Sequence, residues 1–330
     1  MRELTIGKND AGQRLDKFLS KTLYRMPDSL MYRYIRLKKV KVNRKRAEGN
    51  TKLCEGDTVQ LFIKDEFFIR SENSSSSFGF VPKISVVYED ENIIVCDKRP
   101  GVLVHPDSSG DDRNTLLLHI KAYLFQKGEY DPDDEQSFAP SLCNRIDRNT
   151  GGLVIAAKNA AALREINRII REDLINKYYL CIVHGTFSKK SDTVESYLLK
   201  DHENNRVMIS DEPSPGWKKI ITEYRCLQTA DDLSLLEINL LTGRTHQIRA
   251  HLAHIGHPVM GDGKYGHNRD DRSKGFKYQA LYSYRIVFKN ITGELSYLSN
   301  KEISVPIEEI WFCSMFKESF SEKRQGSNDV

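Results

Sequence analysis

The stretch NRIDRNTGGLVIAAK, residues 144–158, places one acid between two arginines, just before a Gly-Gly pair and a run of apolar residues. A continuous apolar run of this kind predicts a strand buried on both faces of a sheet. Asp147 then lies at the mouth of a core strand, where neighbouring cations would keep its carboxylate ionised, as a nucleophile or base requires. The same acid can equally close a turn by accepting hydrogen bonds from backbone amides. The local pattern leaves both interpretations open.

Two later segments carry polar residues in ordered patterns. Residues 177–185, KYYLCIVHG, form a β-rich run that ends in glycine. Residues 241–258, LTGRTHQIRAHLAHIGHP, have the pattern of a helix with a glycine stop. In that helix Arg249 lies roughly a quarter-turn from an apolar stripe, at the edge of the predicted buried face. From there its side chain is able to reach inward.

Taken together, these segments resemble the RluA-type family of RNA pseudouridine synthases. The family signature is roughly HRLDxxTSG, followed by KxYxAxVxG and GRxHQIRxHL, and the chain has related motifs in the same order. The resemblance also covers residues 87–95, 98–101, 104–106, 261–266 and 280–285. It implies the pseudouridine synthase fold and the isomerisation of uridine in RNA.

The chain departs from the family signature at three positions. Asn144 stands where the family has His, Ile146 where it has Leu, and Gly151 where it has Ser. None of these departures removes the acid, the aromatic residue or the arginine. They concern fine positioning and not the reaction.

The resemblance assigns roles to individual residues. Asp147 matches the catalytic aspartate, which either attacks the nucleotide or removes a sugar proton to give a glycal, and both routes stay open. Tyr179 matches the tyrosine that stacks on the target base, and Arg249 matches the arginine that pairs with the acid. An ion pair between Arg249 and Asp147 is therefore predicted. Substrate-binding residues are predicted at Arg145, Arg148, Arg244, His246 and Leu281.

Composition narrows the class of protein. The 330 residues are 39% hydrophobic and 29% charged, and no run approaches the ~20 apolar residues of a membrane span. The six cysteines form no Cys-x-x-Cys pair, which predicts a reducing, cytoplasmic location and argues against disulfides or a thiolate zinc site. The histidines at 246, 251, 254 and 257 lack the helical spacing of a zinc motif. We expect no metal, no cofactor and no membrane partner, and a monomer.

Charge is concentrated near the N-terminus. Residues 1–64 hold 16 Lys/Arg against 7 Asp/Glu, whereas the rest of the chain holds 34 against 39. A dense cluster of one sign favours a polyanionic partner, here RNA, with ribosomal RNA favoured and transfer RNA as the alternative. The predicted RNA-binding cluster consists of Arg33, Arg36, Lys38, Lys39, Lys41, Arg44, Lys45 and Arg46.

Hairpins and short strands outnumber helices, which predicts an α+β fold with a mixed, largely antiparallel sheet. We expect an N-terminal RNA-binding domain over 10–64, similar to the S4 type, in which Ser29 caps a helix that buries Leu30, Tyr34 and Leu37. A serine-rich linker follows over 65–82, then the catalytic domain over 83–312, and a disordered tail over 318–330.

Two other functions are compatible with parts of the pattern. A non-catalytic RNA-binding factor would have no need of Asp147, Tyr179 and Arg249 in combination. A hydrolase that uses Asp147 as its nucleophile would need a water-activating partner, and the sequence offers no pattern for one.

Overall fold

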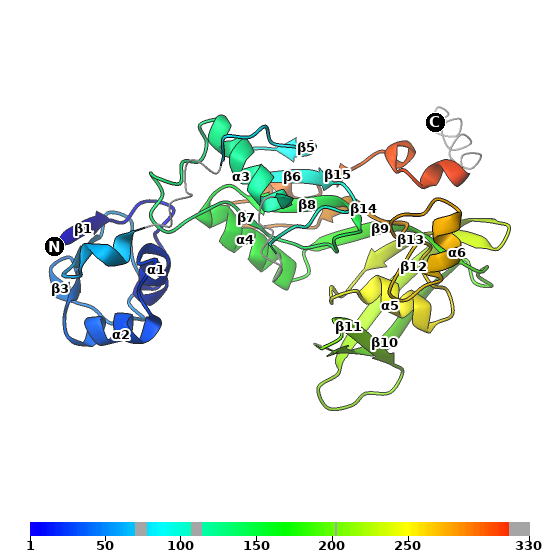
Figure 1. The fold of residues 1–330 in the computed structure, drawn as a ribbon, viewed down its shortest axis with the longest axis horizontal. Coiled ribbons are helices and arrows are strands. Elements are labelled where there is room, and N and C mark those ends of the chain that lie inside the picture. The colour runs from blue at the N-terminus through cyan, green and yellow to red at the C-terminus, as the bar shows by residue number, and fades with distance from the viewer. Residues whose placement is uncertain (70–77, 107–113, 202, 317–330) are drawn as a thin grey trace.

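The computed structural model describes residues 1–69, 78–106, 114–201 and 203–316 (Figure 1). Residues 70–77 of the predicted serine-rich linker and the whole of the predicted disordered tail lie outside these ranges. Two separate sheets organise the described residues, one of four strands and one of eleven. The four-stranded sheet belongs to the N-terminal part of the chain, which lies at one end of the elongated molecule (Figure 1).

The N-terminal part has its own antiparallel sheet and its own apolar core. Its elements are β1 (Arg2–Thr5), α1 (Leu15–Thr22), α2 (Asp28–Arg36), β2 (Val40–Val42), β3 (Lys45–Arg46), β4 (Thr58–Leu61) and the 3₁₀ turn η1 (Asp65–Phe68). The predicted cap at Ser29 is wrong, because Pro27 precedes the first turn of α2. Met31 and Ile35 are buried, and the predicted Leu30 and Tyr34 pack partly buried against the same core, whereas Leu37, predicted to be buried, is 56% exposed.

The large sheet is mixed, as predicted from the sequence. Its strands pair in the order β11-β10-β12-β13-β9-β14-β8-β6-β5, with β15 added to β14 and β7 to β8. Only the β14–β8 pairing is parallel among the described ladders. The strands are β5 (Val86–Glu89), β6 (Ile93–Lys98), β7 (Ser141–Leu142), β8 (Gly151–Ala157), β9 (Ile175–His184), β10 (Ser191–Asp201), β11 (Arg206–Ser210), β12 (Lys218–Ala230), β13 (Leu233–Leu240), β14 (Leu281–Phe288) and β15 (Glu302–Ser304).

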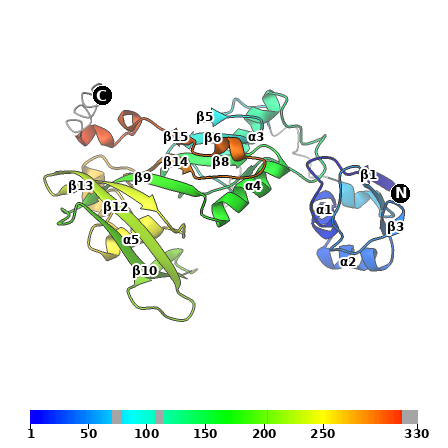
Figure 2. The same ribbon diagram turned by 180° about the vertical axis from the view of Figure 1, so that it is seen from behind.

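Helices and turns cover both faces of this sheet. They are α3 (Leu116–Gln126), α4 (Ala160–Arg171), α5 (Gln247–His254), α6 (Asn268–Ser273), η4 (Ser296–Leu298), η5 (Ile307–Glu309) and η6 (Cys313–Phe316). Helices α3 and α4 lie on opposite sides of the half that contains β6 and β8 (Figure 1; seen from behind in Figure 2). No helix in the described ranges is long and apolar enough to cross a membrane.

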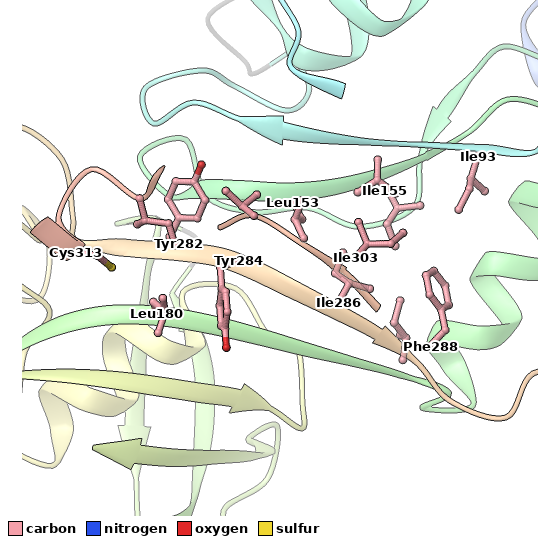
Figure 3. Packing of buried hydrophobic residues seen from close by; sticks show 14 of the residues in the cluster. Ile93, Leu153, Ile155, Leu180, Tyr282, Tyr284, Ile286, Phe288, Ile303 and Cys313 are labelled. Atoms are coloured by element: carbon pink, nitrogen blue, oxygen red, sulfur yellow. The ribbon is translucent and has the colours of Figure 1, made fainter. Parts of the chain in front are cut away.

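Strand β8 is buried along its whole length, as the apolar run predicted. Alternate residues face two different cores, so that Leu153 and Ile155 pack with β14 and the C-terminal turns, while Val154 packs on the side of α3. Figure 3 shows the first of these cores, with Leu153, Ile155 and Ile286 pointing toward one another. Because β8 also pairs with β14, the loop that precedes β8 is held beside the start of β14.

The N-terminal part contacts the rest of the chain through polar groups, which the sequence did not predict. Residues 5–13 meet the loop at 135–137 and the start of α4. Six hydrogen bonds join them: Asn9 Nδ2 to Glu135 Oε1 (2.6 Å), Gln13 Nε2 to Ser137 Oγ (2.7 Å), Ser137 Oγ to Asp10 Oδ1 (2.5 Å), Gln136 Nε2 to the Thr5 carbonyl (2.7 Å), Ala160 N to Asn9 Oδ1 (3.2 Å) and Arg164 Nη1 to the Ala11 carbonyl (3.2 Å).

Gly152 is the position where β8 and β14 approach most closely. Its φ is +110°, and a Cβ built there would lie 2.2 Å from the carbonyl oxygen of Ser283. We expect Gly152→Ala to lower the free energy of unfolding by at least about 3 kcal/mol, because backbone strain and overpacking add. Gly128→Ala is the matched control, since its φ is +72° and nothing lies within 4 Å. Denaturant unfolding of both variants measures the difference, and equal losses would contradict the close approach.

Candidate active site

Asp147 lies on the loop between β7 and β8, and its side chain is 27% exposed. Lys98, the last residue of β6, anchors this loop. Its side chain is only 1% exposed. The Lys98 ammonium donates to the carbonyl oxygens of Arg99, Val102 and Arg148 at 3.1, 2.9 and 2.9 Å. Burial lowers the pKa of Lys98 to about 7, although the charges of Asp147 and Asp97 act in the opposite direction.

Arg249 holds Asp147 from helix α5. Its Nη1 donates to Asp147 Oδ2 at 2.6 Å, so the predicted ion pair is confirmed. The other side of the guanidinium binds Asp262, with Nε and Nη2 each 2.7 Å from a carboxylate oxygen. Only an arginine offers a planar fork that serves two carboxylates at once.

Asp262 is fully buried, and the sequence did not identify it as part of the site. Its Oδ1 also accepts hydrogen bonds from the backbone amides of Lys264 and Tyr265 at 2.8 and 3.2 Å. Burial alone would raise the pKa of Asp262, but Arg249 and these amides lower it overall. The available signal was the Gly-Asp-Gly of residues 261–263 inside one of the recognised motifs.

Burial and the ion pairs shift the pKa of Arg249 in opposite directions. Burial lowers its pKa, whereas the hydrogen bonds and charges of Asp262 and Asp147 raise the pKa above the ordinary value. The guanidinium therefore stays charged at every pH at which the protein folds. One charged guanidinium thus serves both Asp147 and Asp262.

Tyr179 comes from the centre of β9 and is 6% exposed. Burial raises the pKa of its phenol to about 12, and the charge of Asp147 acts in the same direction. At neutral pH the ring is therefore a neutral, flat surface beside the acid. Leu281, at the start of β14, is 3% exposed and belongs to the same apolar core as Tyr179.

A cavity of about 610 Å³ opens over these residues. This volume is in the range of small-molecule sites. Its lining includes the predicted residues Arg145, Asp147, Tyr179, Arg244, His246, Arg249 and Leu281. Arg148 does not line it; its exposed side chain donates from Nε to the Gly101 carbonyl at 3.1 Å.

The departures from the family signature have local physical causes. Asn144 Oδ1 accepts a hydrogen bond from the Ile155 amide at 2.8 Å and so ties the loop to β8. At Gly151 a Cβ would lie 2.5 Å from the Tyr282 ring, which leaves no space for a serine side chain. Both positions support the loop that carries Asp147.

The histidines near α5 are engaged in hydrogen bonds. His251, which is 1% exposed, contacts the hydroxyls of Thr222 and Ser196 at 2.9 and 3.2 Å, and burial lowers its pKa to about 4. His254 contacts Asp211 at 2.9 Å. Within the described ranges, no group of three or more His, Cys, Asp or Glu side chains is arranged to hold a metal ion.

The basic cluster of the N-terminal part is presented to solvent. Seven of its eight side chains are exposed, and the eighth, Lys41, is partly buried with its Nζ 5.6 Å from the centre of the Phe62 ring. Lys38 and Arg44 have positive φ values, as expected in tight turns between the helix and strands.

Comparisons with known proteins point to one family. Residues 92–254 match the model described as RNA pseudouridylate synthase. The chain is 33% identical over 300 residues to an uncharacterised RNA pseudouridine synthase of Mycoplasma genitalium, covering 89% of this chain and 92% of that protein. It is 31% identical over 312 residues to ribosomal large subunit pseudouridine synthase C of Vibrio cholerae, covering 92% and 93%. It is 35% identical over 233 residues to ribosomal large subunit pseudouridine synthase D of Borreliella burgdorferi, covering 68% of each.

Solved structures show the same fold. The human RNA pseudouridylate synthase domain containing 1 protein superposes with a TM-score of 0.56 at 21% identity, covering 76% of this chain and 98% of that one. The corresponding domain containing 4 protein gives a TM-score of 0.55 at 17% identity, covering 70% and 92%.

The two-sided ion pair predicts a characteristic stability pattern. We expect Arg249→Ala to lower the free energy of unfolding by about 3–5 kcal/mol at pH 7, because buried Asp262 loses its cation. In the wild type the lowered pKa of Asp262 gives stability that is present above the unfolded value, near 3.9, and is lost as pH falls. In the variant burial raises that pKa, so the deficit should shrink toward pH 4.

The control is the double variant Arg249→Met with Asp262→Asn, which removes the buried charges together. It should recover much of the stability at pH 7. Denaturant unfolding across pH 4–8 measures all three proteins. A loss in Arg249→Ala that neither depends on pH nor responds to Asp262→Asn would show that the pair does not act in this way.

Proposed function

Because the chain belongs to the RluA-type family of RNA pseudouridine synthases and isomerises uridine to pseudouridine in RNA, we propose that its substrate is ribosomal RNA, with the large subunit favoured. The named relatives that act on the large ribosomal subunit support this choice. The cavity supports a polyanionic substrate, since five basic side chains and one acid line it.

One observation carries the assignment of Asp147 as the catalytic residue. Arg249 binds Oδ2 only, and within the described ranges no residue donates to Oδ1. An oriented carboxylate with one free oxygen, next to a buried aromatic ring, suits a reaction at the sugar carbon of a flipped-out uridine.

The reaction breaks the bond between C1′ and N1 of uracil and forms a bond between C1′ and C5. The C5 proton leaves, and N1 gains a proton. Asp147 supports the first step either by attacking C1′ or by removing a sugar proton, and both routes use the free oxygen. Tyr179, with its phenol protonated, holds the detached uracil flat while it turns, and Arg249 holds the Asp147 carboxyl group in place.

The N-terminal part supplies affinity for RNA. We propose that residues 10–64 form an S4-type RNA-binding domain, supported by two helices followed by short strands and by the exposed basic cluster. The polar contact at residues 135–137 holds this cluster in a defined relation to the cavity. A target uridine at a fixed position relative to a neighbouring RNA helix would be selected in this way.

The catalytic assignment predicts that Asp147→Asn abolishes isomerisation while RNA binding stays close to wild type. The amide is nearly isosteric but acts neither as nucleophile nor as base. Tritium release from RNA labelled at uridine C5 is the measurement. The exposed Asp270→Asn on α6 is the control and should retain full activity. Turnover by Asp147→Asn within tenfold of wild type would overturn the assignment.

The wild-type protein and Asp147→Asn also test the proposed substrate in cells. Cells that lack the gene should lose pseudouridine at defined positions of large-subunit ribosomal RNA. Wild type should restore them, and Asp147→Asn should not. Losses confined to transfer RNA would contradict the proposed substrate and leave the reaction in place.

The basic cluster predicts a salt effect. Replacing Arg44, Lys45 and Arg46 by Gln should weaken RNA binding and reduce the slope of log K against log salt by roughly 0.7–0.9 for each phosphate that is no longer neutralised. Full-length protein is used, so that the contact at residues 135–137 is retained. Exchanging the exposed Lys8, Lys17 and Lys52 for Gln removes equal charge outside the cluster. Equal slopes for both triple variants would show that the cluster does not bind RNA.

A further inference from the structure

The cavity contains cations that the ion pair at Asp147 does not use. Its basic lining residues are Arg145, Lys177, Lys200, Arg244 and Arg249, and its one acid is Asp147. Arg249 is committed to two carboxylates. In the described part of the chain, the other four make no ion pair with an acid.

Lys177 differs from the other three because it is partly buried, whereas they are exposed. It lies on β9 two residues before Tyr179, so both side chains leave the same face of the strand. Its Nζ is 3.7 Å from the place a Cβ would take at Gly243, on the rim of the cavity. The charge of Asp173 raises the pKa of Lys177, but the Asp173 carboxylate is already paired with Lys289 at 3.1 Å.

A partly buried ammonium group without an ion-pair partner is less favourable than one that is fully surrounded by water. Burial accordingly lowers the pKa of Lys177, with Asp173 opposing the shift only in part. The position of Lys177, directed at the cavity, suits a cation whose anion arrives with the substrate.

We propose that Lys177 binds a backbone phosphate of the RNA next to the target uridine. The proposal rests on the proposed function, because RNA supplies the phosphate. Two residues along a strand span about 6.6 Å, and the lysine stem adds further reach. Lys177 is thus placed to hold the backbone of the nucleotide whose base lies on Tyr179.

This contact has a definite part in the reaction. Once the bond between C1′ and uracil is broken, Tyr179 holds the base and Asp147 faces the sugar. A phosphate held by Lys177 keeps the sugar in register while the base turns. Lys177 is therefore a positioning residue. It orients the flipped nucleotide and contributes little to the overall affinity for RNA.

The first test uses uridine, uridine 3′-monophosphate and uridine 5′-monophosphate as probes, with calorimetry on full-length protein. We expect one monophosphate to bind wild type at least about tenfold more tightly than uridine. That gain should vanish in Lys177→Met and survive largely in Lys177→Arg. The preferred isomer identifies which flanking phosphate is bound. Equal affinities of all three probes for wild type and Lys177→Met would overturn the proposal.

The second test separates positioning from a structural role. Lys177→Met should reduce the single-turnover rate of tritium release from transcribed large-subunit ribosomal RNA by about tenfold or more, with RNA affinity within about threefold. Its melting temperature should stay level or rise, because a partly buried cation without an ion-pair partner is removed. A fall in melting temperature together with equal losses for all three probes would show that Lys177 is structural. The exposed Lys190→Met removes the same charge elsewhere and should change none of these quantities.

The two proposals fail in different ways. A wild-type protein that prefers a monophosphate but releases no tritium from ribosomal RNA contradicts the proposed substrate and leaves the phosphate site standing. A protein that releases tritium but does not distinguish the probes keeps its function and loses the phosphate site.

Discussion

The site depends on one buried arginine shared by two carboxylates. Arg249 gives its fork to Asp262, which is fully buried, and its remaining nitrogen to Asp147. A lysine in this place would satisfy one acid and leave the other to rotate. The bidentate contact fixes the plane of the guanidinium, and that plane fixes the carboxylate of Asp147. The orientation of the reacting acid therefore depends on Asp262, which does not itself line the cavity.

The ion pair keeps its geometry only if helix α5 is held in place by the surrounding structure. Helix α5, which carries Arg249, is tied to β12 and β10 by uncharged contacts. Gln247 donates to the Ile221 carbonyl and the Thr222 hydroxyl, both at 3.1 Å, and His251 links Thr222 to Ser196. Because the groups in this network are neutral and hydrogen-bonded to one another, they bring no further charge into the buried region around the ion pair.

The family resemblance was enough to predict the pairing of Asp147 with Arg249, and the continuous apolar run was enough to predict the buried strand β8. They were not enough for Asp262 or Lys98, because backbone groups are among the partners of both: the amides of Lys264 and Tyr265 for Asp262, and three carbonyl oxygens for Lys98. The burial of Leu37 was predicted incorrectly, since α2 ends at Arg36 and Leu37 lies beyond the helix at its C-cap, where it is exposed. The contact between residues 5–13 and 135–137 gave no signal, because it is built from short polar side chains that are common on surfaces.

Arg249 and Lys177 both line the cavity, but they differ in their partners and therefore in their roles. Arg249 has its carboxylates within the protein, so it stabilises the fold and orients an acid in the absence of substrate. Lys177 lines the same cavity and forms no ion pair with an acid among the described residues, so its charge is available to an anionic ligand. A position that is unfavourable for folding persists when binding uses it. Lys177, which has no ion pair, thus indicates the charge of the ligand, whereas Arg249 indicates which acid reacts.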